Sequence, residues 1–418
     1  MEKYRVFGDE STGVHPFIPL SCMKAQLTPQ ASSLLVRLLT STLSLILSAL
    51  LFLLAILRLL LLSFAALWTA VVQQVLIVFA PFSRLYWYLS LWLLAFPKRL
   101  ALYSLGVFRL EEQRADFRRL KIRAPPPNSP SPCASLLSLP VSPFSSLSGS
   151  ATGGLSAADA KRIASCRVCF SNFTSFVEPL YLSYRLNPQF VLIHEKGGFS
   201  FCSFWEILRF SLQFRLAPGR GTYRSLSSLL VAHATRSSPA IPVVIFPEGQ
   251  KSNGLCILQW WAGEEKSSAV GFDAAALRLL EGRIAEVGCM YSSIFVKGSE
   301  RQKTSLGRRV PYGPAHTINS PLTHLRCLLS EVCSNGLVAI WASPTDVQQA
   351  SSQARGAGGG DGRAEDSETA VACLRDVMVR MMPGIASVNN KSGRDLAPFV
   401  DYWEKTQKEQ YLKKDKKF

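Results

Sequence analysis

The chain has 418 residues, 48% of them hydrophobic, and a formal net charge of +17. This length is enough for one large domain or two ordinary ones, each with an apolar core. The positive charge favours anionic membranes and phosphorylated ligands as partners. Nucleic acid would attract the same charge, but the basic residues show no recognition-helix or aromatic-platform pattern, so we expect no nucleic-acid partner.

Residues 1–33 are expected to form a polar N-terminal tail. Two charge-free runs follow, 20 residues at 38–57 and 25 residues at 59–83, with only Arg58 between them. Each run is long enough to cross the hydrocarbon core of a bilayer, and both are too long for a signal peptide. Neither Gly nor Pro marks a turn near Arg58, so a hairpin, one long tilted span and a re-entrant pair all remain open. This uneven distribution of apolar residues argues for a membrane-attached enzyme or adaptor and against a multi-span channel.

Residues 82–103 combine aromatic and basic side chains at a density that suits the lipid headgroup layer. The side chains concerned are Tyr86, Trp87, Tyr88, Trp92, Arg84, Lys98 and Arg99. We therefore interpret residues 34–103 as a membrane anchor followed by an interfacial helix.

The remaining chain divides into segments by composition. A lead-in strand and basic segment is expected at 104–123, a central domain at 161–345 and a C-terminal helical tail at 371–418. Two inserts interrupt them, a Pro- and Ser-rich one at 124–160 and a Gly- and Ala-rich one at 346–370. Neither insert contains enough apolar side chains to offset the entropy of ordering it, so both are expected to be disordered.

The central domain alternates short apolar runs with helical patterns. The predicted strands are 167–170, 190–193, 242–246 and 292–296, and the predicted helices are 179–184, 205–214, 226–235 and 274–286. This alternation predicts an α/β sheet flanked by helices. Ligands of such sheets collect where strands end at their carboxyl side, and the segments SNFTSFVEPL (171–180) and IFPEGQKSNG (245–254) lie at two such ends.

FPEGQKS, at 246–252, resembles the FPEG block of the glycerolipid acyltransferases, which transfer an acyl group from acyl-CoA to a lysophospholipid. SNFTSFVE lies upstream at the spacing of that family's NHxxxxD block. CMYSS, PYGP and LAPFVDYWEKTQ further along resemble its fungal lysophosphatidic acid acyltransferases. The resemblance implies a glycerolipid acyltransferase-type sheet at 161–345 behind an N-terminal transmembrane or hairpin anchor.

The resemblance also assigns roles to residues of the first block, SNFTSFVE. Asn172, Phe173 and Glu178 take the Asn, His and Asp positions, and Thr174 and Ser175 fall between them as substrate-binding residues. The family's His removes the proton of the acceptor hydroxyl, which Phe173 cannot do. Glu178 is one candidate base, because a semi-buried carboxylate has a raised pKa, and the alternative role is a carboxylate that stabilises a helix start.

His194, at the end of a predicted strand, is the other candidate catalytic residue, and its alternative is an ordinary polar terminus. A third option needs no base, because orientation of the substrates alone accelerates the reaction.

In the second block, Gly249 allows a tight turn, and Lys251 and Ser252 converge on the acceptor's phosphate. Glu248 would face the glycerol hydroxyls or hold the loop. Lys251 replaces the family's Arg, which makes phosphate binding looser. The family also has an arginine in a Gly-rich segment before FPEG. The nearest stretch here is 214–221, and Arg215 is a weak match for that arginine.

No metal or cofactor is expected besides acyl-CoA as co-substrate, because no ligand cluster has suitable spacing and the single CxxC pair lies in a predicted strand.

These features predict an enzyme that acylates a lysophospholipid, most simply lysophosphatidic acid to phosphatidic acid, with acyl-CoA, lysophospholipid and membrane lipid as partners. Lys414 and Lys416 form a dilysine pattern, which indicates the endoplasmic reticulum membrane with the domain in the cytosol, and the lipid droplet is an alternative site. The rival interpretation is a lipid-binding or membrane-trafficking protein that lost its base. An ion-handling protein has only Arg58 in its favour.

Overall fold

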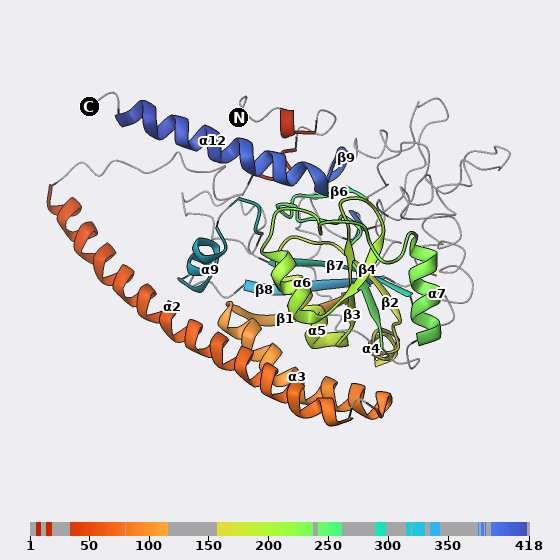
Figure 1. The fold of residues 1–418 in the computed structure, drawn as a ribbon. Coiled ribbons are helices and arrows are strands. Elements are labelled where there is room, and N and C mark those ends of the chain that lie inside the picture. The colour runs from red at the N-terminus through yellow and green to blue at the C-terminus, as the bar shows by residue number, and fades with distance from the viewer. Residues whose placement is uncertain are drawn as a thin grey trace.

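The computed structural model of the 418-residue chain describes residues 6–9, 14–18, 34–79, 81–115, 157–236, 241–260, 289–297, 315–318, 320–330, 335–342, 375, 378–379, 381 and 386–415. Within them the protein is a mixed α/β fold with one long apolar helix near the N-terminus (Figure 1). The expected helix at 274–286 and the insert at 346–370 lie outside these residues. Of the first insert, residues 157–160 are described, and they open a helix.

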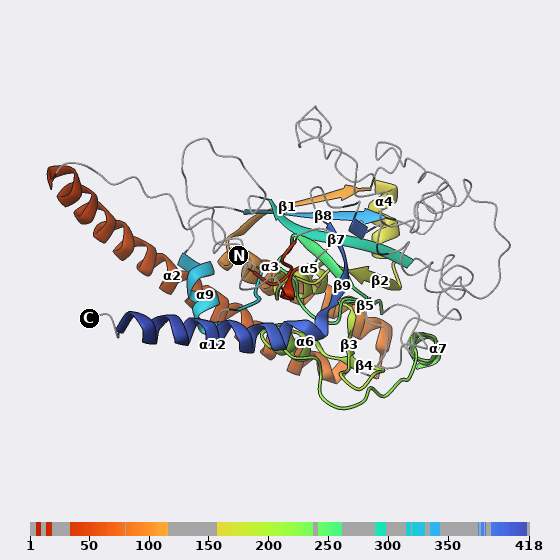
Figure 2. The ribbon, with the colours of Figure 1, turned by 90° about the horizontal axis from the view of Figure 1, so that it is seen from above.

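A seven-stranded sheet forms the centre, in the order β1-β8-β7-β2-β5-β3-β4. Its strands are β1 (Val107–Arg114), β2 (Val168–Ser171), β3 (Gln189–Ile193), β4 (Phe199–Cys202), β5 (Val243–Ile245), β7 (Cys289–Lys297) and β8 (Asn335–Ala342). The four neighbours β7, β2, β5 and β3 run parallel, whereas β8 and β4 are antiparallel to β7 and β3. The strands fan from β1 to β4 with the usual twist (Figure 2).

The predicted strands are confirmed as β2, β3, β5 and β7, with ends that differ by up to three residues. A second, two-stranded sheet pairs β6 (Cys256–Gln259) with β9 (Ala386–Ser392). The helices are α2 (Leu34–Leu76), η2 (Ile77–Phe79), α3 (Ser83–Ser104), α4 (Ala157–Ala164), α5 (Val177–Leu186), α6 (Phe204–Ser211), α7 (Leu226–Arg236), α9 (Pro321–Ser330), η5 (Gly393–Asp395) and α12 (Leu396–Asp415).

Alternate residues of the central strands face opposite sides of the sheet. Phe190 and Val244 join the core cluster under α3, α5 and α6. Val191 and Ile245, each the next residue along its strand, join the cluster that includes α7. Ala65 of α2 and Leu102 of α3 belong to the first cluster, and no described residue of either helix belongs to the second, so the two anchor helices cover one face of the sheet.

Helix α2 runs without a break through Arg58, so no turn lies there. Residues Ala49–Phe79 are the one helical segment in the described part of the chain that is long and apolar enough to cross a membrane. At 1.5 Å per residue, the 43 residues of α2 extend about 65 Å. The chain reverses after η2, and α3 returns beside α2 as an antiparallel pair (Figure 1).

Polar side chains fix this helix pair to the domain. Arg58 Nη1 donates to Leu329 O at 3.0 Å, Trp205 Nε1 donates to Gln73 Oε1 at 2.8 Å, and Lys98 Nζ donates to Ser183 O at 3.1 Å. One face of the helix pair therefore packs against the α/β domain.

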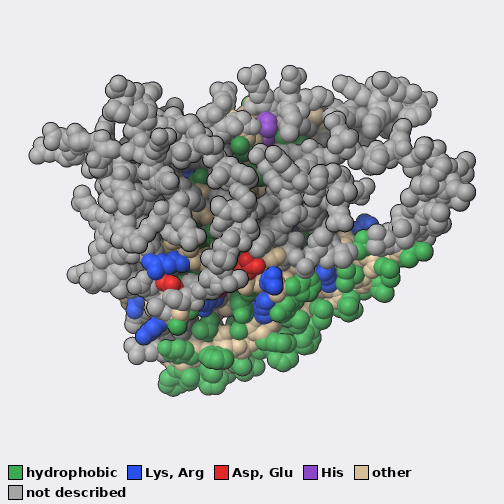
Figure 3. All heavy atoms as spheres, turned by 180° about the vertical axis from the view of Figure 1, so that it is seen from behind, with side chains coloured by type: hydrophobic (Ala, Val, Ile, Leu, Met, Phe, Trp, Pro, Cys, Tyr) green, Lys and Arg blue, Asp and Glu red, His purple; other side chains and the backbone are tan. Residues whose placement is uncertain are grey.

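The other face of the pair is apolar and exposed. Figure 3 shows it as a band of hydrophobic side chains with Lys and Arg side chains beside it. It includes Leu53, Leu60, Leu67, Val75, Phe82, Trp92 and Phe96. Such a band, bordered by cations, suits insertion into lipid.

The described residues of the N-terminal segment pack against the domain. Phe17 and Ile18 are buried in a cluster with Phe399 of α12 and Leu258 of β6. Helix α12 thereby packs against both the N-terminal segment and β6.

Candidate functional site

The two sequence blocks meet at the carboxyl ends of β2 and β5. These strands are adjacent and parallel, so the segments that leave them emerge side by side. The backbone N of Phe173 donates to Glu248 Oε1 at 3.0 Å, and the backbone N of Ser252 donates to Phe173 O at 3.1 Å. The site is thus formed by both blocks together.

Glu248 holds the loop in place. Its second oxygen accepts a hydrogen bond from the backbone N of Leu258 at 2.9 Å, and the side chain is buried. Burial raises the pKa of Glu248 to about 8, against the opposing effect of the two backbone donors. Of the two roles predicted for this residue, the contacts match the holding of the loop.

Gly249 makes the turn after β5. Its φ of 71° lies in the left-handed region that favours glycine, and an added Cβ would lie 3.2 Å from Leu216 Cδ2. The next residue, Gln250, donates from Nε2 to Arg215 O at 2.6 Å. The turn therefore brings the 214–221 segment against the loop.

Glu178 lies in the first turn of α5 and bonds back to the residues before the helix. It accepts hydrogen bonds from the hydroxyl of Thr174, from the backbone N of Ser175 at 2.9 Å and from Ser175 Oγ at 3.0 Å. Burial raises the pKa of Glu178, whereas these donors lower it. Its present contacts are those of a carboxylate at a helix start, and Thr174 and Ser175 serve it as donors.

Lys251 is fully buried, with no exposed side-chain surface. Its Nζ donates to Ser211 O at 2.5 Å, lies 3.2 Å from His316 Nδ1 and sits 4.7 Å from the centre of the Phe214 ring. Burial lowers its pKa well below 10.5, and the charge of Glu178 opposes that shift. The ammonium is therefore disfavoured, and the amine is not presented to solvent as a phosphate clamp would be.

The remaining predicted residues lie close by. Ser252 donates from Oγ to Cys256 O at 2.9 Å, and Asn172 is buried beside Phe173 at the end of β2. Phe173 stacks on Phe246, with ring centres 4.6 Å apart. The side chain of Phe173 is thus part of an apolar stack.

His194 ends β3 at the same edge of the sheet but contacts other groups. Its Nδ1 lies 3.1 Å from Pro218 O and its Nε2 lies 2.7 Å from Ser200 Oγ. None of these contacts reaches Glu178 or Lys251, so the structure places His194 beside the cluster and not in it.

Two histidines that the sequence did not single out are part of the cluster. The backbone N of His316 donates to Thr174 O at 3.1 Å, and its ring lies 4.4 Å from the ring of His324 on α9. His324 in turn meets the Phe176 ring edge to face at 5.8 Å. Neither lies in a motif, so only the fold reveals them.

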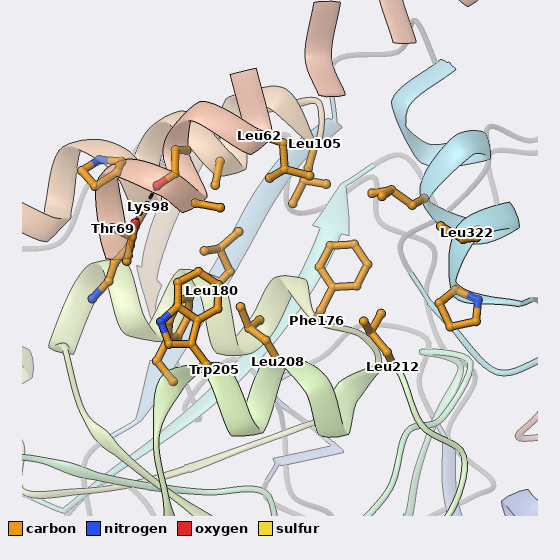
Figure 4. A pocket seen from close by; sticks show the side chains of 17 residues that line it. Leu62, Thr69, Lys98, Leu105, Phe176, Leu180, Trp205, Leu208, Leu212 and Leu322 are labelled. Carbon is orange, nitrogen blue, oxygen red and sulfur yellow. Dashed lines mark hydrogen bonds between the residues drawn. The ribbon is translucent and has the colours of Figure 1, made fainter. Parts of the chain in front are cut away.

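An apolar pocket of about 300 Å³ adjoins this cluster. Helices α2, α3, α5, α6 and α9 surround it, and Figure 4 shows their side chains pointing into the space. Its lining includes Leu62, Ala65, Ala101, Phe176, Leu180, Leu208, Leu212 and Leu325. Phe176 precedes the helix that carries Glu178, and Leu212 follows Ser211, so the pocket and the polar cluster share a wall.

The described residues contain no group of three or more His, Cys, Asp or Glu side chains that could hold a metal ion. Comparison of the chain with protein-family models, curated proteins and solved structures found no match. The assignment of a function therefore depends on the residues and geometry of the site.

Proposed function

We propose that the protein is a membrane-associated acyltransferase that moves an acyl chain from acyl-CoA to a lysophospholipid, most simply lysophosphatidic acid. The observation that carries this proposal is the shared wall between the polar cluster of Glu178 and Lys251 and the apolar pocket. Acyl transfer needs these two environments in contact, because the chain is apolar and the reacting hydroxyl must lose a proton. The resemblance to the glycerolipid acyltransferases supports the same reaction and the same type of fold.

The pocket is suited to the acyl chain. Its lining comes from two sources, the anchor helices α2 and α3 and the domain helices α5, α6 and α9. Leu212 and Leu322 in its wall are partly exposed, at 37% and 81% of their surface. We expect an acyl chain to enter the pocket past these two leucines.

Basic residues near the cluster suit the phosphates of CoA or of the acceptor. Lys196, Arg215 and Arg394 lie on backbone segments that touch each other next to Gly249. Arg394 Nη2 donates to Glu195 O at 2.7 Å, and the backbone N of Lys196 donates to Gly219 O at 3.1 Å. These side chains would attract anionic groups to the rim while the acyl chain lies in the pocket.

The exposed apolar face of α2 and α3 supports residence at a membrane. The endoplasmic reticulum, with the domain on its cytosolic side, is the membrane that we propose, and the lipid droplet is the alternative. The dilysine pattern at Lys414 and Lys416 is the reason for this choice.

The test is release of CoA by the purified protein in vesicles, with oleoyl-CoA and with or without lysophosphatidic acid. Release that depends on the acceptor, with formation of phosphatidic acid, would support the proposal. An absence of acceptor-dependent release for lysophosphatidic acid and for the other lysophospholipids would refute it. A variant with Glu178→Ala tests whether that carboxylate contributes to turnover.

A second candidate is a lipid-binding or membrane-trafficking protein on the same fold. The observation in its favour is Phe173, whose ring stacks on Phe246 and Phe210 where an enzyme of the related family has its base. Such a protein would bind lysophosphatidic acid in vesicles without consuming acyl-CoA, so the same assay separates the two candidates.

A further inference from the structure

The amine of Lys251 is held by two acceptors. Ser211 O accepts at 2.5 Å, and Nδ1 of His316 lies at 3.2 Å. A neutral amine has two hydrogens and one lone pair, so these two contacts use both hydrogens when His316 carries its proton on Nε2. The lone pair of the nitrogen then remains available to accept a third proton.

The surroundings of the amine favour both states that a base must adopt. Complete burial favours the neutral form before reaction. The carboxylate of Glu178, the ring of Phe214 at 4.7 Å and the carbonyl of Ser211 at the C-terminal end of α6 all favour the ammonium once it forms.

Few other titratable groups lie near this amine in the described part of the chain. Glu178 on α5 and His316 before α9 face it, and His324 on α9 lies behind His316. Glu248, on the same loop as Lys251, is bonded to the backbone of Phe173 and Leu258 instead.

The amine is also close to the pocket. Ser211, which binds it, precedes Leu212, and Leu212 lines the pocket. On the other side, His316 is connected through His324 to Phe176, which lines the same pocket. The groups that contact the amine are therefore direct neighbours of residues that line the pocket.

We propose that Lys251 is the proton acceptor of the acyl transfer. It would do the work of the family's histidine, whose position Phe173 occupies here. The inference rests on the proposed acyltransferase function. The hydroxyl of the acceptor gives its proton to Nζ while its oxygen forms a bond to the thioester carbonyl carbon. The carbon–sulfur bond then breaks, the CoA thiolate leaves, and it takes the proton from the ammonium to give free CoA and the ester. His316 is a positioning residue that orients the amine.

The decisive variant is Lys251→Arg. Arginine keeps the positive charge, and the related family has arginine at this position, so a phosphate clamp would tolerate the change. A guanidinium cannot accept a proton, so a base would not. We expect turnover to fall by about 10²–10⁴-fold, the usual contribution of a general base. Lys161→Arg, on the exposed face of α4, is the matched control, and thermal unfolding of each variant reports whether the fold is retained.

Chemical rescue gives a second measurement that does not depend on how well arginine fits. In Lys251→Ala, an added small primary amine should restore part of the turnover in proportion to its unprotonated fraction. If Lys251 instead binds a phosphate, the rescue should follow the protonated fraction of the added amine. Turnover of the wild-type protein should also decline towards acid pH as the amine of Lys251 becomes protonated.

Each outcome is informative. If the wild-type protein is active, loss of turnover in Lys251→Arg together with rescue by free amine supports the proposal. Retained turnover in Lys251→Arg, or a folded Lys251→Ala that no amine rescues, overturns the role of Lys251 and leaves the acyltransferase proposal intact. A wild-type protein without acyl transfer to any lysophospholipid overturns both.

Discussion

Arg58, in the middle of the longest apolar helix, donates a hydrogen bond of 3.0 Å to the carbonyl oxygen of Leu329 near the end of α9. Its guanidinium also lies 5.9 Å from the centre of the Phe108 ring. A charge inside an apolar run often marks an ion pathway. Here its contacts instead connect the anchor to the helix that carries His324.

The substitution Arg58→Met should lower the free energy of unfolding by about 1.5–3 kcal/mol, because it removes a buried hydrogen bond from a charged donor. Denaturant unfolding in detergent measures the change. Arg109→Met, on the exposed side of β1, is the matched control. Equal stability of the two variants would show that the bond to Leu329 does not contribute.

The pocket leads to a prediction about chain length. Ala66 lines the pocket, whereas Ala70, one turn further along α2, is exposed. Ala66→Phe should fill part of the cavity and raise the KM for oleoyl-CoA about tenfold, with a smaller effect on a short-chain acyl-CoA. Ala70→Phe should leave both values unchanged. The same increase for both chain lengths would place the acyl chain elsewhere.

The sequence predicted the four central strands because each is a short apolar run between helical patterns. It also predicted that 171–180 and 245–254 lie at the same edge of the sheet, because both follow strands at whose carboxyl ends ligands collect. The bond from the backbone N of Phe173 to Glu248 is the result.

The surroundings of Lys251 could not be predicted in the same way. His316 is 65 positions from Lys251 and lies in no motif, and its place depends on the hydrogen bond of its backbone N to Thr174 O. The burial of Lys251 could not be predicted either, because a lysine in a polar loop is usually solvated. Only the packing of α6 and α9 around the loop shows that the amine is enclosed.

Glu248 should make the stability of the protein depend on pH. Its pKa is about 8 in the folded protein and about 4.5 in an unfolded chain. Between these values the unfolded chain gives up a proton that the folded protein retains, so the contribution of Glu248 to stability is fully present below about pH 4.5 and is lost as the pH rises to about 8.

The variant Glu248→Gln lacks this titration and should unfold with a shallower dependence on pH, whatever its stability at a single pH. Urea unfolding between pH 5 and pH 8 measures the slope. Exposed Glu195→Gln is the control. The neighbouring Glu178, whose pKa burial also raises, continues to contribute in the same direction. An unchanged slope in Glu248→Gln would mean that its carboxylate is already ionised in the folded protein.

The N-terminal segment should support the loop that carries Lys251. Asn253, two residues beyond Lys251, donates from Nδ2 to His15 O at 2.7 Å and to Ile18 O at 2.8 Å. Phe17 between them is buried, and its ring centre lies 5.5 Å from that of Phe399 on α12.

Phe17→Ala should therefore detach the segment, because loss of a buried ring costs about 3–5 kcal/mol. Limited proteolysis should then cleave the chain near its N-terminus faster than in the wild-type protein or in the exposed control Val6→Ala. Asn253 would lose its hydrogen bonds to His15 O and Ile18 O at the same time, so acyl transfer should also decrease, since the position of Lys251 depends on this loop. Rapid cleavage with full activity would show that the segment packs on the domain without supporting the site.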